Sequence, residues 1–145
     1  MRVFICLPVQ AGYTSIMEKK MSEKKRFSIV ARAQSIKHAI RGVSVIFKTQ
    51  HNAWVHAVVA IVVVILGFVY SINEAEWGLI ILSITSVLVA EGFNTAIEFD
   101  IDLTSPEYHP YARDTKDVAA GAVLLTVIGA VIVGFIIFLP KILAF

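Results

Sequence analysis

Four polar side chains, Glu91, Asn94, Glu98 and Asp102, follow one another at helical spacing within and just beyond an apolar segment of the sequence. At about 100° per residue, Glu98 and Asp102 each lie about 20° from Glu91 on a helical wheel, and Asn94 lies about 60° away. If the segment is a helix, three carboxylates and a carboxamide therefore form one stripe. Such carboxylates can accept a proton from a reacting hydroxyl group or bind a hard cation such as Mg²⁺.

The depth of Glu91 in a lipid bilayer defines its expected role. It lies 14 residues after Trp77 in an apolar stretch, which corresponds to about 21 Å of a roughly 30 Å hydrocarbon core. A charged side chain at the centre of a membrane helix costs about 2.5–3.5 kcal/mol on insertion scales. Because of this cost, an acidic residue within a membrane span is first interpreted as functional. We expect Glu91 to accept a proton from a lipid hydroxyl and Glu98, at or beyond the boundary, to bind the cation. The alternative is a structural acid bonded to a neighbouring helix.

A second polar segment covers residues 104–117 and contains two prolines. In this segment Lys116 can contact phosphate as a point charge, and Glu107 can accept hydrogen bonds from ribose or adenine. The chain has neither of the glycine-rich motifs with which soluble nucleotide-binding proteins hold phosphate. An ordinary hydrophilic turn is an equal alternative for this segment.

The composition indicates which class of protein must position these residues. Of the 145 residues, 57% are hydrophobic and 17% are charged, whereas soluble domains average about 45–50% and 25%. The length fits one domain. The net charge of +2 disfavours nucleic acid as a partner. The single cysteine, Cys6, excludes a disulfide scaffold and a cysteine-based zinc site.

Three apolar stretches are long enough to cross a bilayer as helices, so the sequence predicts an all-α integral membrane protein. The predicted spans cover residues 53–72, 77–97 and 118–139. Pro140 is expected to end the third span. The apolar stretches are therefore the elements that must position the polar stripe.

The basic residues predict the orientation in the membrane. Ten of the 13 Lys and Arg residues precede residue 49, and Arg113 and Lys116 follow in the second loop. By the positive-inside rule, the N-terminus and the second loop lie in the cytoplasm, and the C-terminus lies outside. Lys141, near the C-terminus, is the one basic residue that opposes this orientation.

Residues 29–48 are expected to form an amphipathic helix on the cytoplasmic membrane surface. Apolar residues recur there at intervals of three and four, at Ile29, Ala33, Ile36, Ile40, Val43 and Phe47. Basic residues lie off this face, as in helices of the membrane interface. An ordinary packed helix is the alternative. Residues 1–24 are interpreted as a disordered leader or a mis-called start, which leaves residues 25–145 as a single membrane domain.

The polar stripe belongs to a longer pattern. The string EGFNTAIE at residues 91–98 is followed by Asp102, His109, Lys116-Asp117 and the run AAGAV at residues 119–123. This pattern resembles the small prokaryotic integral-membrane diacylglycerol kinase and undecaprenol kinase family, over about residues 26–139. The resemblance implies a homotrimer in the inner cell membrane, with active sites between subunits at the cytoplasmic surface. It also implies transfer of the γ-phosphate of Mg·ATP to a lipid hydroxyl.

The resemblance also implies roles for single residues. By position, Glu91 is the catalytic base, Asn94 supports the site and Glu98 binds the metal. The residues expected to bind the Mg·ATP cofactor are Glu98, Glu107, Tyr108, His109, Lys116, Asp117 and Arg32. Gln50 stands where the family usually has a second metal-binding glutamate. A neutral amide binds Mg²⁺ less well, although the Gln50 carbonyl could coordinate the ion directly or through water.

Two questions stay open at this level. The acceptor is undecaprenol or diacylglycerol, and the run at residues 118–123 with His109-Pro110 favours undecaprenol. A different class is a small proton-coupled membrane transporter that uses Glu91 as a relay, because a lone intramembrane acid can serve this purpose. A structural subunit without chemistry is the remaining alternative.

Overall fold

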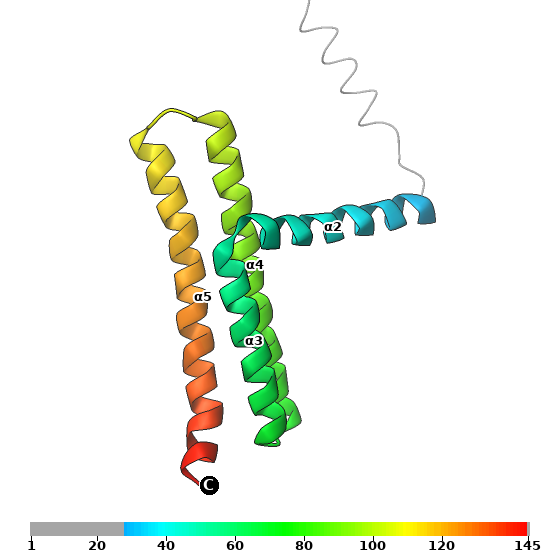
Figure 1. Ribbon diagram of the computed structural model, residues 1–145, viewed down its shortest axis with the longest axis vertical. Coiled ribbons are helices and arrows are strands. Elements are labelled where there is room, and N and C mark those ends of the chain that lie inside the picture. Colours follow the sequence, from blue (N-terminus) through cyan, green and yellow to red (C-terminus); the bar gives the residue numbers. More distant parts are fainter. Residues whose placement is uncertain (1–27, 145) are drawn as a thin grey trace, which may run out of the picture. The chain divides into compact units, whose positions relative to one another are not determined.

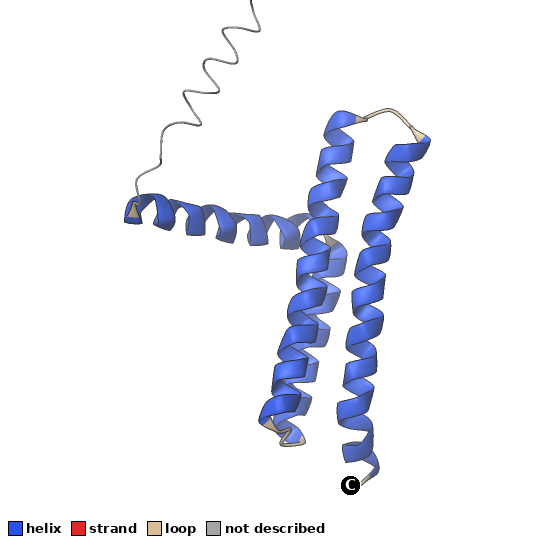
Figure 2. Cartoon of the chain, turned by 180° about the vertical axis from the view of Figure 1, so that it is seen from behind, coloured by secondary structure: helices blue, strands red, loops and turns tan. Residues whose placement is uncertain are grey.

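The computed structural model describes residues 28–144, and all regular secondary structure in that range is helical (Figures 1 and 2). The helices are α2 (Ile29–Thr49), α3 (His51–Val69), α4 (Glu74–Thr104) and α5 (Pro110–Leu143). The predicted all-helical class is confirmed. The chain divides into two units between His38 and Ala39, and the three long apolar helices all belong to the second. The predicted leader at residues 1–24 lies outside the described residues.

Helices α3, α4 and α5 are each long and apolar enough to cross a membrane. Their 19, 31 and 34 residues correspond to about 28, 46 and 51 Å. Helix α4 packs against both α3 and α5, and the three lie side by side in Figure 1. Many large apolar side chains on their outer faces are exposed, including Val58, Ile65 and Phe135. Such apolar faces are suited to contact with lipid. The number of predicted membrane spans, three, is confirmed.

The first connection is a tight turn that ends α3 three residues before the predicted limit at residue 72. Ser71 has a positive φ of 49°, and a residue in this region does not continue a right-handed helix. The backbone N–H of Ser71 donates to the carbonyl of Phe68 at 3.2 Å, and that of Ile72 donates to Gly67 at 3.1 Å. This pair of bonds is a Schellman ending. After this turn, the Ile72 side chain is buried and packs in the apolar core.

Gly67 permits this turn to pack closely. A Cβ atom at position 67 would lie 2.7 Å from Cη2 of Trp77 and 3.1 Å from Cδ1 of Ile72. The Trp77 ring also contacts Phe68, with ring centroids 4.9 Å apart. The indole of α4 therefore occupies space that only a glycine on α3 leaves available.

The start of α4 is fixed by a capping box. The Asn73 side chain accepts from the backbone N–H of Glu76 at 3.0 Å, and Glu76 Oε2 accepts from the backbone N–H of Asn73 at 2.8 Å. The helix therefore begins at Glu74 rather than at the predicted residue 77. The same Glu76 carboxylate pairs with Lys141 Nζ at 3.1 Å. This ion pair explains why Lys141, which opposes the charge rule, is tolerated at this end of the molecule.

The expectation that Pro140 ends the last helix is wrong. Helix α5 contains Pro140 and continues to Leu143, and the backbone N–H of Ala144 donates to the Pro140 carbonyl at 3.1 Å. A proline has no N–H to donate and its ring crowds the carbonyl four residues before it, but its own carbonyl remains an acceptor. The final turn of the helix can therefore close after it.

The second connection is shorter than predicted, because α4 continues to Thr104 and α5 begins at Pro110. His109 is the N-cap of α5, and its Nδ1 accepts from the backbone N–H of Tyr111 at 3.3 Å. Proline at the first helical position has its φ angle already fixed for a helix. Three residues expected in the loop therefore lie on α5, namely Arg113, Lys116 and Asp117.

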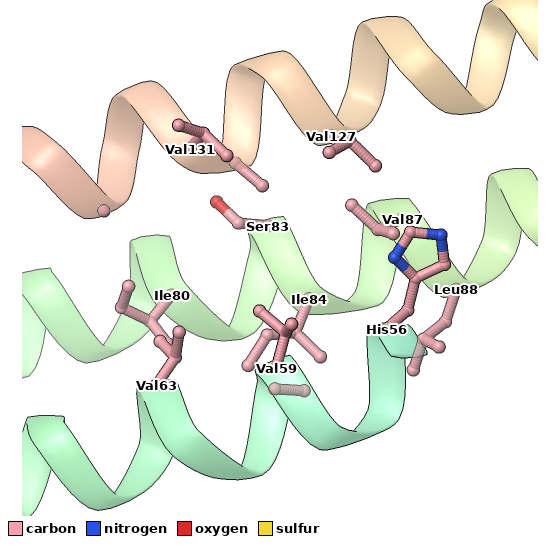
Figure 3. Close-up of a pocket in the computed structure, with 13 residues that line it drawn as sticks. His56, Val59, Val63, Ile80, Ser83, Ile84, Val87, Leu88, Val127 and Val131 are labelled. Atoms are coloured by element: carbon pink, nitrogen blue, oxygen red, sulfur yellow. The ribbon is translucent and has the colours of Figure 1, made fainter. Parts of the chain in front are cut away.

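The helices pack through a small apolar core and leave a cavity of about 160 Å³ between them. The core cluster consists of Ile72, Ile80, Ile137 and Phe138. The cavity is lined mainly by aliphatic side chains, with His56 and Ser83 as polar members (Figure 3). None of the candidate catalytic or cofactor-binding residues lines it. The candidate polar residues therefore lie outside this cavity.

Candidate active site on helix α4

Glu91 is buried within the helical bundle and carries an unsatisfied oxygen. Its exposed fraction is 2%, and Oε1 has no hydrogen-bond partner. Val87, Asn94 and Thr95, which lie on the same face of α4, are also buried. The Thr95 hydroxyl donates to the Glu91 backbone carbonyl at 2.8 Å and so leaves the carboxylate unaffected. A buried carboxylate oxygen without a donor is ready to accept a hydrogen bond from a ligand.

Two amide groups hold the Glu98 carboxylate, which lies two turns further along α4. Asn94 Nδ2 donates to Glu98 Oε1 at 2.9 Å, and Gln50 Nε2 donates to Glu98 Oε2 at 2.5 Å. Each oxygen of Glu98 therefore accepts one amide N–H. The other end of the Asn94 amide, Oδ1, is buried and has no partner. The structure thus brings together Asn94, Glu98 and Gln50, and their expected roles toward a metal ion stay predictions.

Gln50 reaches α4 because of its place between two helices. It is the N-cap of α3, has an extended backbone and makes no side-chain cap. Its backbone N–H donates to the carbonyl of Ile46 at 2.9 Å. Trp54 reinforces the corner, since its indole N–H donates to the Phe47 carbonyl at 2.7 Å and its ring meets the Phe47 ring edge-on. The Gln50 side chain is therefore available to contact Glu98.

A separate cleft of about 400 Å³ lies where α4 passes into α5. Five candidate cofactor-binding residues line this cleft, namely Glu107, Tyr108, His109, Lys116 and Asp117. The cleft also contains Asp102 and Arg113, which the site prediction did not include. Lys116 Nζ pairs with Asp102 at 2.5 Å, and Arg113 pairs with Asp117 at 3.5 Å.

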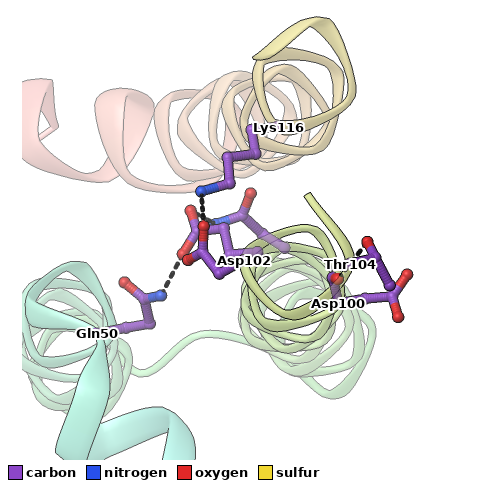
Figure 4. Close-up of polar contacts among 7 residues, drawn as sticks. Gln50, Asp100, Asp102, Thr104 and Lys116 are labelled. Atoms are coloured by element: carbon purple, nitrogen blue, oxygen red, sulfur yellow. Dashed lines mark hydrogen bonds and ion pairs between the residues drawn. The ribbon is translucent and has the colours of Figure 1, made fainter. Parts of the chain in front are cut away.

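The sequence contains patterns that could have pointed to Asp102 and Arg113 as residues of the cleft. Asp102 lies on the same stripe as Glu91, and Arg113 precedes Asp117 by four residues, the spacing of helical ion pairs. Figure 4 shows Gln50, at the corner between α2 and α3, and Lys116, on α5, both approaching α4. Arg32 belongs to the other unit of the chain, and its expected contact with phosphate stays a prediction.

The donor set near Glu98 fits a metal ion that is shared with a phosphate ligand. Within residues 28–144, no three His, Cys, Asp or Glu side chains gather into a metal site. Mg²⁺, however, is usually bound by one or two carboxylates together with substrate phosphates and water. Glu98 provides the carboxylate, and the amide oxygens of Gln50 and Asn94 are further hard donors, of which Asn94 Oδ1 is buried without a partner. The residues present therefore suit Mg²⁺ bound with a nucleotide.

Fold and site together define a polytopic helical membrane protein with a carboxylate stripe that runs from the bundle to an open, charged cleft. Residues 37–138 match the family model described as prokaryotic diacylglycerol kinase. The undecaprenol kinase of Bacillus subtilis (strain 168) is 41% identical over 108 residues, which cover 74% of this chain and 88% of that protein. The diacylglycerol kinase of Synechocystis is 38% identical over 111 residues, 76% of this chain and 63% of that protein. The diacylglycerol kinase of Escherichia coli (strain K12) is 41% identical over 54 residues, 37% of this chain and 44% of that protein.

The chain belongs to the prokaryotic diacylglycerol kinase family and is a lipid kinase. Membership in a kinase family implies ATP as the phosphoryl donor. It also favours an enzyme over a proton-coupled transporter or a structural subunit.

Proposed function

We propose that this lipid kinase transfers the γ-phosphate of Mg·ATP to the hydroxyl group of a membrane lipid, with Glu91 as the catalytic base. The observation that carries the proposal is the buried Glu91 carboxylate, 2% exposed, whose Oε1 has no partner. A lipid hydroxyl that enters the site would donate its hydrogen bond to this atom. No other described carboxylate is both buried and without a donor on one oxygen.

In this mechanism, Glu91 orients the hydroxyl and takes its proton as the oxygen attacks the γ-phosphorus. The bond from oxygen to the γ-phosphorus forms, the bond to the β,γ-bridging oxygen breaks, and ADP leaves. Phosphoryl transfer depends mainly on positioning and on charge stabilisation. General-base assistance typically contributes about 10²- to 10⁴-fold. Asn94 supports the site by donating a hydrogen bond to Glu98 Oε1, which fixes the orientation of that carboxylate.

The Mg·ATP complex is assigned to the region between Glu98 and the cleft at the α4–α5 connection. Mg²⁺ would be held by Glu98, with Gln50 as a weaker ligand, and would neutralise charge on the phosphates. Glu107, Tyr108, His109, Lys116 and Asp117 are proposed to bind the nucleotide, because all five line the cleft. Arg32 is proposed as an additional phosphate contact.

The acceptor, the location and the assembly are further parts of the proposal. Undecaprenol is the preferred acceptor, because the relative named undecaprenol kinase is aligned over 88% of its length. The active site faces the cytoplasm from the inner membrane, in agreement with the basic N-terminal region. Helix α2 is proposed to lie on the membrane surface. Residues 25–145 are proposed to form one lipid-kinase domain, and three copies form the active trimer.

The test is phosphorylation of a lipid alcohol by the full-length protein in phospholipid vesicles. With γ-labelled ATP and Mg²⁺, wild type should label undecaprenol in preference to diacylglycerol. Glu91→Gln should lower single-turnover phosphorylation at least about 100-fold while equilibrium ATP binding survives. The matched control is Glu74→Gln, an exposed acid at the other end of α4, which should keep wild-type turnover. If Glu91→Gln loses ATP binding as much as rate, Glu91 belongs to the nucleotide or metal site and is not the base.

A further inference from the structure

The ion pair between Asp102 and Lys116 connects two helices at the cleft proposed for the nucleotide. Asp102 lies on α4 and Lys116 lies on α5, and Lys116 Nζ donates to Asp102 Oδ1 at 2.5 Å (Figure 4). Both residues line the cleft together with His109 and Asp117. Asp102 follows Glu98 by one helical turn, about 6 Å along the axis of α4. The pair therefore lies between the expected metal ligand and the rest of the cleft.

The exposure of this pair indicates that stability is not its main role. The Asp102 side chain is 66% exposed and the Lys116 side chain is 35% exposed. Ion pairs at such exposed positions contribute little to folding, because water screens them and the side chains lose freedom. A change that removes the Asp102 charge should therefore leave the fold intact.

A single contact to Asp102 nevertheless limits where the Lys116 ammonium can lie. Lysine has a flexible four-carbon stem and loses considerable rotamer freedom when its end is fixed. Its ammonium has three N–H donors, so a bond to Asp102 leaves two donors for another acceptor. A ligand phosphate can bind without breaking the bond to Asp102.

We propose that Asp102 is a positioning residue that holds the Lys116 ammonium in the cleft for the phosphates of ATP. The inference rests on the proposed function, in which the cleft binds ATP, and it assigns a role to a residue outside the predicted site. Because the ammonium is already placed, ATP binding does not have to fix a mobile lysine side chain. The contribution of Asp102 is to ATP affinity and acts only through Lys116.

An alternative role for the contact between Asp102 and Lys116 would have the opposite effect on ATP affinity. If Asp102 competed with phosphate for Lys116, its carboxylate would weaken ATP binding, and removing its charge would strengthen it. The direction of the change in KM for ATP therefore separates a positioning residue from a competitor.

The test measures KM and kcat for ATP with the full-length protein in vesicles that contain a lipid acceptor phosphorylated by wild type. Asp102→Asn should raise KM for ATP about 3- to 10-fold with kcat within about twofold. Asp102→Glu, which keeps the carboxylate on a longer stem, should restore KM to within about twofold of wild type. In a Lys116→Gln background, Asp102→Asn should add almost no further change, because the two residues act as one unit.

Asp100→Asn is the matched control. Asp100 is an exposed acid two residues before Asp102, about 200° around α4, and it does not line the cleft. This variant removes the same charge and should leave KM for ATP unchanged. The thermal unfolding midpoint of Asp102→Asn should match that of wild type.

Each other outcome overturns a specific statement. A lower KM in Asp102→Asn would make Asp102 a competitor of ATP. If Asp102→Asn raised KM for ATP equally in the wild-type and the Lys116→Gln backgrounds, the effect would not act through Lys116. If Asp100→Asn raised KM as much as Asp102→Asn, the effect would be one of general charge. Either result would reject the inference. If wild type phosphorylates no lipid alcohol, the proposed function itself fails, and this result is distinguishable because it precedes any comparison of variants.

Discussion

The contact between Gln50 and Glu98 makes a testable prediction about metal use. Gln50→Glu should make the stability of the protein depend on Mg²⁺, because a second carboxylate would then face Glu98 where an amide now donates to it at 2.5 Å. Without a cation the two carboxylates repel each other. With Mg²⁺ they become a pair of ligands of the kind that this ion prefers.

The size of the effect follows from two contributions. Loss of a hydrogen bond between an amide and a charged carboxylate costs about 1.5–3 kcal/mol. Two like charges about 4 Å apart repel by about 4 kcal/mol at an effective dielectric of 20. Both residues are half-buried, so solvent reduces the total to about 2–4 kcal/mol. At about 2–4 °C per kcal/mol, the unfolding midpoint in EDTA should fall by roughly 5–15 °C.

Two measurements check this prediction. Thermal unfolding in mild detergent should show the fall in EDTA and its recovery in millimolar Mg²⁺, whereas Gln50→Ala should lose only the hydrogen bond and gain nothing from Mg²⁺. Lipid phosphorylation should continue in Gln50→Glu, with half-maximal activity at a free Mg²⁺ concentration at least about threefold lower than in wild type. If Gln50→Glu behaves like Gln50→Ala in both assays, or abolishes turnover, position 50 does not face the metal and the reasoning is wrong.

Two further predictions concern packing and assembly. Gly67→Ala should lower the unfolding midpoint by an amount equivalent to about 1–3 kcal/mol, because the added methyl group meets Trp77 at 2.7 Å. Gly78→Ala, which meets no atom within 4 Å, is the control and should be neutral or stabilising. Crosslinking of the wild-type protein in mild detergent should stop at three subunits, and a fully active monomer would contradict the proposed trimer.

The residues of the α4 stripe could be predicted from the sequence because they depend on one local property. A single helix with 3.6 residues per turn is enough to place Glu91, Asn94 and Glu98 on one face. The contact from Asn94 to Glu98 is of this kind, since its partners are four residues apart. The three apolar spans were predictable for a similar reason, because their composition alone indicates a membrane environment.

The ends of the helices were less predictable, because they depend on single hydrogen bonds. Pro140 has the residue type that commonly stops a helix, yet one backbone bond from Ala144 closes another turn. His109 shortened the second loop by capping α5 with its ring nitrogen, so that Lys116 lies on a helix. Hydropathy gives no information on contacts of this type.

Contacts between distant parts of the chain were the hardest to predict. Gln50 and Glu98 are 48 residues apart, and Asp102 and Lys116 are 14 residues apart. Periodicity places each residue on a face of its own helix, but the packing of the helices decides which faces meet. The role of Gln50 could be expected only from the family pattern, and the partner of Lys116 could not be expected at all.

The length of α4 fits the proposal that one helix serves both a lipid and a nucleotide. Its 31 residues span about 46 Å, whereas a hydrocarbon core of roughly 30 Å needs about 20 residues. Counted from Glu74, a core of that thickness ends close to Asn94. Glu91 then lies just inside the apolar layer, and Glu98 and Asp102 lie in the polar region beyond it. A helix that only crossed the membrane would end near Glu91 and leave no surface for the phosphates of the proposed nucleotide. The part of α4 beyond the membrane, with the short connection to α5, is therefore as necessary to the proposed reaction as the buried carboxylate.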